Sequence, residues 1–287
     1  MKPFFRLVKQ TAASWSAHKA PKMGAALAYY ATFSMAPLLV LITGIAGLVV
    51  ERDEAREAIM SQLSLLMGRN GEELADTILT HTAQQASGLW ATIIGFVVLL
   101  VGASGVFGEL QDSLNIIWDV PPRERPWRAL IRVRLLSFSM VFALGFLMLV
   151  SLAFSAAIAA MEAYVKGWFS ELDMIWEAAN SLISFTVITL LFAAIYRILP
   201  DVRIAWRDVW TGAAMTALLF VLGKYLLGVY IAHSAFASAY GAIGSLVVLL
   251  AWIFYSAQIF FFGAEFTCIF ARKHGSHGPT ATVRRKH

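Results

Sequence analysis

The chain has 287 residues, of which 59% are hydrophobic and 14% charged, and its formal net charge is +5. An average soluble domain is about 45–50% apolar and about 25% charged, so this composition excludes soluble enzymes, secreted disulfide scaffolds and disordered proteins. A single cysteine, Cys268, allows no intrachain disulfide. Several windows of about 20 apolar residues, the length that crosses a bilayer core, indicate an integral membrane protein.

The first 23 residues form a predicted cytoplasmic arm with an amphipathic pattern. Basic residues occupy the rest of a helical surface whose apolar face consists of Phe4, Leu7, Val8, Ala12 and Trp15. A basic amphipathic segment of this kind lies flat at the lipid headgroups. We therefore expect the arm to anchor the chain to anionic lipid.

Six apolar runs are predicted to cross the membrane as helices, because hydrocarbon offers no water to satisfy backbone N–H and C=O groups. They cover residues 24–50, 88–108, 135–161, 178–196, 209–232 and 242–270. The predicted fold is an all-α integral membrane protein with a six-helix membrane domain over residues 24–271. A disordered basic tail is predicted over residues 272–287, which lack apolar periodicity beyond Gly275.

Lysine and arginine are divided unequally between the two sides of this bundle. The arm, the connections after the second and fourth spans and the tail together hold 18 of them, and the opposite side holds four: Arg52, Arg56, Arg69 and Lys166. The positive-inside rule therefore places both termini in the cytoplasm.

The connection over residues 51–87, on the outer side, is acidic. It carries seven carboxylates, with helical periodicity on both sides of a turn at residues 68–71, which predicts a short helical hairpin over the outer mouth of the bundle. Calcium loops need oxygen ligands at tight alternate spacing. Because this segment lacks that spacing, a solvated cap without a ligand is favoured over a cation site.

Polar side chains within apolar spans are costly and often face a bundle interior or a water path. Lys224 lies about 12 Å from the outer end of its span at 1.5 Å per residue, where lining a cavity and snorkelling to the headgroups are equally supported. Gln258 and Glu265 share one face of the sixth span. An interhelical hydrogen bond for Gln258 and an interfacial position for Glu265 beside Arg272 are favoured over a polar track.

Other features of the spans favour packing. Pro37 kinks a helix and suits either a hinge or static packing. Glu109 begins an amphipathic inner-face helix, where ion pairs with the arginines of residues 123–134 are the preferred interpretation. Small residues recur at threes in the second span (Gly102, Gly105 and Gly108) and at fours in the third (Ser151, Ser155 and Ala159), which lets helices approach closely.

Motifs for catalysis and cofactor binding are missing from the sequence. It has no phosphate-binding glycine loop, no nucleophile elbow and no zinc spacing, and its six histidines are scattered. No catalytic residue, metal site or cofactor is predicted. The basic tail lacks interleaved aromatic residues to stack bases, so no nucleic-acid partner is expected.

Four blocks of the sequence resemble the YihY/BrkB family. They are ALAYYATFSMAPLLVL (26–41), LQDSLNIIW (110–118), YRILPDVRIAWRDVWTGA (196–213) and YGAIGSLVVLLAWIFYSAQIFFFGAEFT (240–267). The motif positions within them are Tyr29, Tyr30, Ser34, Asn115, Pro200, Asp201 and Gly263. The resemblance implies a six-helix protein of the bacterial inner (plasma) membrane. It also implies links to virulence, serum resistance or export of lipid precursors, and an old ribonuclease label that no residue here supports.

The leading hypothesis is a non-enzymatic protein that moves, or helps to move, an amphipathic envelope component such as a lipid. Lys224, Gln258, Glu265 and Glu109 would lie along the route, with Pro37 as a hinge. The expected partners are membrane lipids, and the basic inner rim favours anionic ones. The alternatives are a non-transporting scaffold or regulator of envelope assembly, with small-residue seams as partner interfaces, and the disfavoured ribonuclease. A homo-oligomer is left open.

Overall fold

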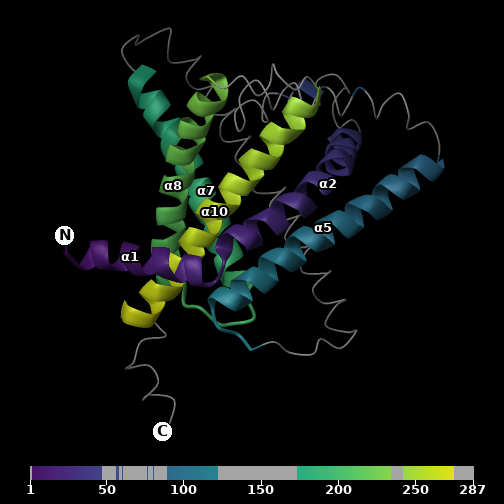
Figure 1. Ribbon diagram of the computed structural model, residues 1–287. Helices are drawn as coiled ribbons and strands as arrows, with labels where there is room; N and C mark the ends of the chain where they lie inside the picture. Colours follow the sequence, from purple (N-terminus) through teal and green to yellow (C-terminus); the bar gives the residue numbers. More distant parts are fainter. Residues whose placement is uncertain are drawn as a thin grey trace. The chain divides into compact units, whose positions relative to one another are not determined.

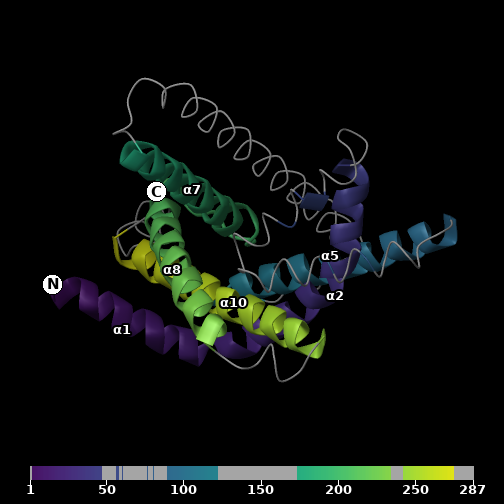
Figure 2. The same ribbon diagram turned by 90° about the horizontal axis from the view of Figure 1, so that it is seen from above.

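The computed structural model describes residues 2–46, 56–57, 60, 76, 80, 89–121, 173–233 and 242–274, and all regular structure in these ranges is helical. The helices are α1 (Lys2–Ala17), α2 (Ala20–Ala46), α5 (Leu89–Ile117), α7 (Asp173–Ile198), α8 (Trp206–His233) and α10 (Ala242–His274) (Figures 1 and 2). The all-α prediction is confirmed for this part of the chain. The predicted third span and the tail beyond residue 274 lie outside it.

Three of these helices are long and apolar enough to cross a membrane. The stretches are Ser181–Ile198, Trp206–Leu226 and Leu246–Lys273, found within the described ranges. Large apolar side chains on α8, including Leu218 and Leu222, are more than half exposed. Such a face is unfavourable in water and suits contact with lipid. The structure therefore supports a membrane-embedded protein, whereas the count of six spans and their orientation stay predictions.

The chain divides into two compact units. Unit 1 comprises residues 1–14, 114–219 and 262–287. Within it, α7 and α8 lie side by side (Figures 1 and 2), and the edge of the Phe4 ring on α1 meets Phe266 of α10, with the ring centroids 6.5 Å apart. Lys273 also donates a hydrogen bond to Gln10. The amphipathic arm thus packs on the last turns of α10 through both an aromatic and a polar contact.

Unit 2 comprises residues 15–113 and 220–261. Ala28 of α2 packs with Leu249 and Ile253 of α10 in a buried apolar cluster. The same helix α2 lies close to α5 at two glycines. A Cβ atom on Gly102 would lie 2.8 Å from Ser34 Cβ, and one on Gly105 would lie 2.5 Å from Tyr30 Cδ1. Both glycines therefore act in packing, as their spacing predicted, whereas the same prediction is wrong for Gly108, where a Cβ atom would meet nothing within 4 Å among the described residues.

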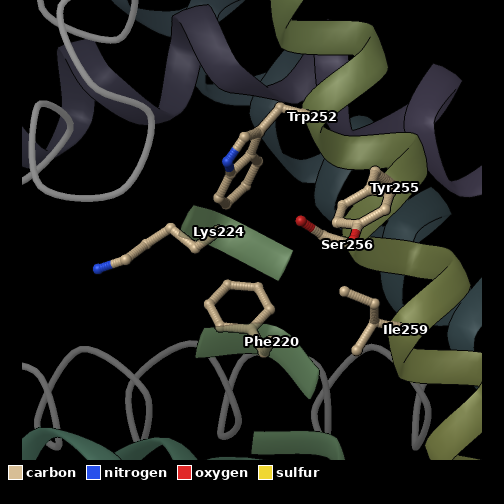
Figure 3. Close-up of a pocket in the computed structure, with 6 residues that line it drawn as sticks. All are labelled: Phe220, Lys224, Trp252, Tyr255, Ser256 and Ile259. Atoms are coloured by element: carbon tan, nitrogen blue, oxygen red, sulfur yellow. The ribbon is translucent and has the colours of Figure 1, made fainter. Parts of the chain in front are cut away.

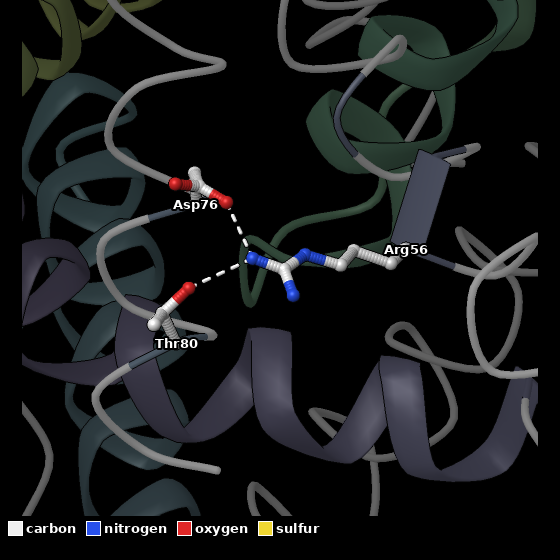
Figure 4. A network of polar contacts seen from close by, with 3 residues as sticks. All are labelled: Arg56, Asp76 and Thr80. Atoms are coloured by element: carbon white, nitrogen blue, oxygen red, sulfur yellow. Dashed lines mark hydrogen bonds and ion pairs between the residues drawn. The ribbon is translucent and has the colours of Figure 1, made fainter. Parts of the chain in front are cut away.

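A polar network joins two described parts of the acidic loop, where residues 56–57, 60, 76 and 80 are all helical. The Arg56 guanidinium donates to the Asp76 carboxylate and, at 2.8 Å, to Thr80 Oγ1 (Figure 4). Asp76 and Thr80 are four residues apart and so share one helical face. This is the contact that two arms of a helical hairpin would make, and the remaining residues of 51–87 lie outside the described part.

Candidate functional site

A reciprocal seam between α8 and α10 lies within unit 1. A Cβ atom on Gly212 of α8 would overlap Thr267 Oγ1, and one on Gly263 of α10 would overlap Thr216 Oγ1. Each threonine hydroxyl donates to the glycine carbonyl one turn earlier on its own helix, at 2.7 Å in both cases. Each helix therefore inserts a threonine, with its hydroxyl satisfied, over the glycine of the other helix.

Helix α7 joins this seam through Tyr196. Its hydroxyl lies 3.1 Å from Thr216 Oγ1, and the side chain is 1% exposed. A Cβ atom on Gly263 would also lie 2.7 Å from the Tyr196 hydroxyl. The absence of a side chain at Gly263 thus lets three helices meet at one point. Gly263 is a predicted motif position, whereas Tyr196, Thr216 and Thr267 were not singled out from the sequence.

Two further motif positions, Asn115 and Asp201, meet within unit 1. Asn115 Nδ2 donates to Asp201 Oδ2 at 2.9 Å, and the Asp201 backbone N–H donates to Asn115 Oδ1 at 2.8 Å. The side chain of Asn115 is 9% exposed, and Pro200 beside this pair in sequence is also buried. The last turn of α5 is thereby fixed to the α7–α8 connection.

The end of α5 has a well-defined termination. Asp119 has a φ of 52°, and the Val120 N–H donates to the Asn115 carbonyl at 2.9 Å, as in a C-terminal helix cap. Asp119 also forms a salt bridge of 2.7 Å with Arg272. The Cys268 thiol donates to the Ile117 carbonyl at 3.3 Å. One helix end is therefore held by α10 at two points.

The carboxyl group of Glu265 is buried in unit 1, since the residue is 1% exposed. The charge of Arg272, two turns later on α10, interacts with that of Glu265. The interfacial position of Glu265 beside Arg272 stays a prediction, and the structure shows that the side chain is buried among the described residues.

The amide of Gln258 occupies an unusual position in unit 2. It lies directly against Gly24 of α2, where a Cβ atom would overlap Nε2 and approach Cδ to 3.2 Å. Both amide atoms are buried, and neither has a hydrogen-bond partner among the residues that the structure describes. Among the described residues the amide makes an interhelical contact without a bond, and the interhelical hydrogen bond favoured from the sequence stays a prediction.

Lys224 lines a shallow groove between α8 and α10, also in unit 2. The other residues that line the groove are Phe220, Trp252, Tyr255, Ser256 and Ile259. Figure 3 shows the lysine stem at the groove and the ammonium extending away from α10. Lys224 is exposed, and no ion pair joins it to another residue within the described ranges.

Glu109, one residue beyond the predicted second span, is half-buried and accepts a hydrogen bond of 3.4 Å from Ser113 Oγ. Burial, followed by the charge of Asp112, raises the pKa of its carboxyl above the usual range, and the bond from Ser113 opposes this. The arginines of residues 123–134, its expected partners, lie outside the described residues.

The remaining motif positions are on α2. Tyr29 and Tyr30 are exposed, their ring centroids 5.6 Å apart, and the buried Ser34 donates to the Ala31 carbonyl at 3.0 Å. Pro37 falls inside the continuous helix α2. The structure brings Tyr30 and Ser34 to the glycines of α5. Of the residues predicted to lie along a transport route, Glu109, Lys224 and Gln258 belong to unit 2 and Glu265 belongs to unit 1.

In the part of the chain that the structure covers, no group of three or more His, Cys, Asp or Glu side chains lies close enough to hold a metal ion. The polar groups that do gather, namely the pair Asn115–Asp201 and the seam around Tyr196 and Thr216, are neutral or singly charged. Their contacts hold helices together.

Apolar helices of membrane-spanning length, with apolar exposed faces and polar side chains between them, define a multi-pass integral membrane protein. The family described as virulence factor BrkB matches residues 11–287. The chain belongs to this family, so the resemblance carried by the four sequence blocks is confirmed. No solved structure matches the chain.

Curated relatives carry general names. A Bacillus subtilis protein named as ribonuclease-like, YfkH, is 24% identical over 93% of this chain and 95% of its own length. A UPF0761 membrane protein of Stenotrophomonas maltophilia is 28% identical over 80% of this chain and 52% of its own length. One from Pseudomonas aeruginosa is 27% identical over 87% and 59%. The chain thus spans little more than half of the UPF0761 relatives.

The seam around Gly263 corresponds to a repeated spacing in the sequence. Gly212 and Thr216 are four residues apart on α8, and Gly263 and Thr267 have the same spacing on α10. A small residue and a hydroxyl residue at this spacing are typical of close helix packing in membranes. Comparing the two spans would have predicted that these helices pair.

Proposed function

We propose that the chain is a six-span protein of the bacterial inner membrane, with both termini in the cytoplasm, that moves or helps to move an amphipathic envelope component such as a lipid. Membership of a membrane-protein family and the apolar helices support the location. The proposal does not assign an enzymatic reaction to the chain.

The observation that carries the transport proposal is the amide of Gln258. A buried amide without a hydrogen bond costs about 1–3 kcal/mol, and its two buried polar atoms have no partner in the described part of the chain. Polar side chains inside membrane helices are functional candidates by default. The amide would gain hydrogen bonds when a polar headgroup or water enters between α2 and α10. Transport requires such a state, and this state lacks the free-energy cost of the unsatisfied amide.

Replacing Gln258 with leucine tests this role. The variant Gln258→Leu should keep or raise the melting temperature, because it removes an unsatisfied amide, and should lower the flipping rate of anionic lipid at least tenfold. The measurement is reduction of fluorescent headgroups in proteoliposomes. Phe254→Leu, an exposed apolar change on the same helix, is the matched control. If the wild-type chain flips no native anionic lipid, or if Gln258→Leu flips normally, the proposal fails.

The proposed orientation has its own test. A fluorescent-protein reporter at either terminus should be active, and a phosphatase inserted within residues 51–87 should be active outside the cytoplasm, because cationic segments stay inside. Active phosphatase at either terminus, or a mapped count other than six crossings, would contradict the proposed topology. The role proposed for Gln258 would not be affected by that result.

A non-transporting scaffold is the alternative. In it, small-residue seams would contact a partner protein. Gly102, Gly105, Gly212 and Gly263 already contact neighbouring helices of the same chain, whereas a Cβ atom on Gly108 would meet nothing within 4 Å in the described ranges. The small residues of the third span lie outside the described residues. Co-purification of a stoichiometric partner, together with full function after Gln258→Ala and Lys224→Ala, would favour the scaffold.

Ribonuclease activity is suggested by the name of the Bacillus subtilis relative and by the old label of the family, and we propose that this chain lacks it. Highly purified protein should leave RNA intact over hours. Persistent cleavage that a single carboxylate substitution abolishes would overturn this expectation, because contaminating nucleases would not respond to that substitution.

A further inference from the structure

The groove beside Lys224 combines a cation with aromatic walls on a lipid-facing helix. Lys224 belongs to the stretch Trp206–Leu226, which is apolar enough to cross a membrane. Its helix neighbours Leu222, Tyr225 and Leu226 are more than half exposed. An ammonium group on such a face is costly in hydrocarbon, so it must reach either the interface or an anionic partner.

The protein itself supplies no such partner within the described ranges, where Lys224 takes part in no ion pair. From Lys224 to the end of α8 at His233 the helix rises about 14 Å. A lysine stem can extend its ammonium toward the headgroups, and Figure 3 shows the stem extended away from α10. The ammonium is therefore available to an anionic group of the surrounding lipid.

The groove itself is built by close contact of α8 and α10. A Cβ atom on Gly223 would lie 2.7 Å from Ile259 Cδ1 and 2.8 Å from the Tyr255 hydroxyl, so the two helices are in close contact at this glycine. The edge-to-face pair Phe220–Trp252, with centroids 6.2 Å apart, forms a wall. The apolar surface of the groove suits an acyl chain or glycerol backbone.

The polar groups around this groove are hydrogen-bond donors. The hydroxyl groups of Tyr255 and Ser256 lie on the α10 side in Figure 3, and the lysine ammonium extends away from them. No carboxylate is among the lining residues. The ammonium matches a phosphate, whose oxygens accept charge-assisted hydrogen bonds.

We propose that the groove formed by Phe220, Lys224, Trp252, Tyr255, Ser256 and Ile259 is a binding site for an anionic phospholipid. The phosphate is held by Lys224, and part of one acyl chain lies along the aromatic side chains. The depression is too shallow to enclose any part of a lipid, so the lipid stays in the bilayer and contacts it from outside. The site deepens the proposed function, on which it rests for the class of ligand, but binding here does not require transport.

Lipid retention by the purified full-length chain tests the site. Native mass spectrometry with phosphatidylglycerol and phosphatidylcholine should show preferential retention of phosphatidylglycerol. Lys224→Gln should lower that retention about fivefold, equivalent to about 1 kcal/mol, with no change in phosphatidylcholine. Lys224→Arg should preserve retention, because it keeps the positive charge. Lys22→Gln removes the same charge at an exposed residue outside the groove and is the matched control.

The outcomes separate this site from the transport proposal. Equal retention of both lipids, or normal phosphatidylglycerol retention by Lys224→Gln with an unchanged melting temperature, overturns the site even if the chain flips lipid. Selective retention that depends on Lys224, in a chain that flips nothing, supports the site and removes the transport proposal. Equal losses in Lys224→Gln and Lys22→Gln would mean a diffuse charge effect and would overturn the site.

Discussion

Gly263→Val should abolish the folded state or lower its stability by about 3 kcal/mol or more, because the added side chain has no space. Its Cβ would overlap Thr216 Oγ1 and lie 2.7 Å from the Tyr196 hydroxyl, and both partners are 1% exposed or less. Overpacking a dense interior costs about 1–3 kcal/mol even where relaxation is possible. The measurement is the melting temperature and monodisperse yield of the purified chain in detergent.

Two companion variants make this result specific. Gly108→Ala is the control, because a Cβ there meets nothing within 4 Å, and an alanine in a helix gains up to about 1 kcal/mol over glycine. Gly263→Ala should be less stable than Gly263→Ala combined with Thr216→Ala, which removes the overlapping hydroxyl. A fully stable Gly263→Val, or no difference between the last two variants, would show that the three helices do not meet as described.

Asn115→Asp should destabilise the chain by about 2–4 kcal/mol near pH 8, since it places one carboxylate against another and replaces a donor with an acceptor. Asn115 Nδ2 now donates to Asp201 Oδ2 at 2.9 Å. Repulsion raises the carboxyl pKa values of the folded variant, so the folded state binds a proton more readily than the unfolded chain. The deficit should therefore be largest at high pH and shrink as the pH falls toward 5.

The charge arrangement can be exchanged to check this mechanism. Asp201→Asn alone should be mild, because its amide oxygen can accept the same bond. Combining Asn115→Asp with Asp201→Asn restores one donor facing one acceptor, and the Asp201 backbone N–H still has its acceptor at position 115. Thermal melts across pH should show recovery in the double variant. A loss of stability that is independent of pH, and that the double variant does not recover, would show that residue 115 contributes through side-chain packing and not through charge.

Local features of the fold followed from the sequence because they depend on composition and short spacing. Apolar runs of membrane length predicted the helices, and glycines three residues apart predicted the close contact of Gly102 and Gly105 with α2. The pairing of Asn115 with Asp201 did not follow, although both were motif positions. They are 86 residues apart, and one sequence holds no signal for which distant polar groups meet.

The residues of the candidate sites could likewise be predicted from the sequence only in part. Lys224 and Gln258 could be selected because polar side chains are rare in apolar spans. The contact of Gln258 with Gly24 and the lining of the groove at Lys224 depend on how α2 and α8 pack against α10, which periodicity does not fix. Tyr196 and Thr216 escaped notice because a tyrosine and a threonine in a span look ordinary until their hydroxyl groups are seen 3.1 Å apart.

The burial of Cys268 makes the unaltered chain a suitable background for single-cysteine labelling. Its thiol is 2% exposed and engaged with the Ile117 carbonyl, and it is the one cysteine of the sequence. Maleimide reagents should therefore leave the native protein unlabelled, while a cysteine introduced at an exposed position reports its own side of the bilayer. Accessibility maps and distance measurements with paired probes can then begin without first removing a residue that packs against the end of α5.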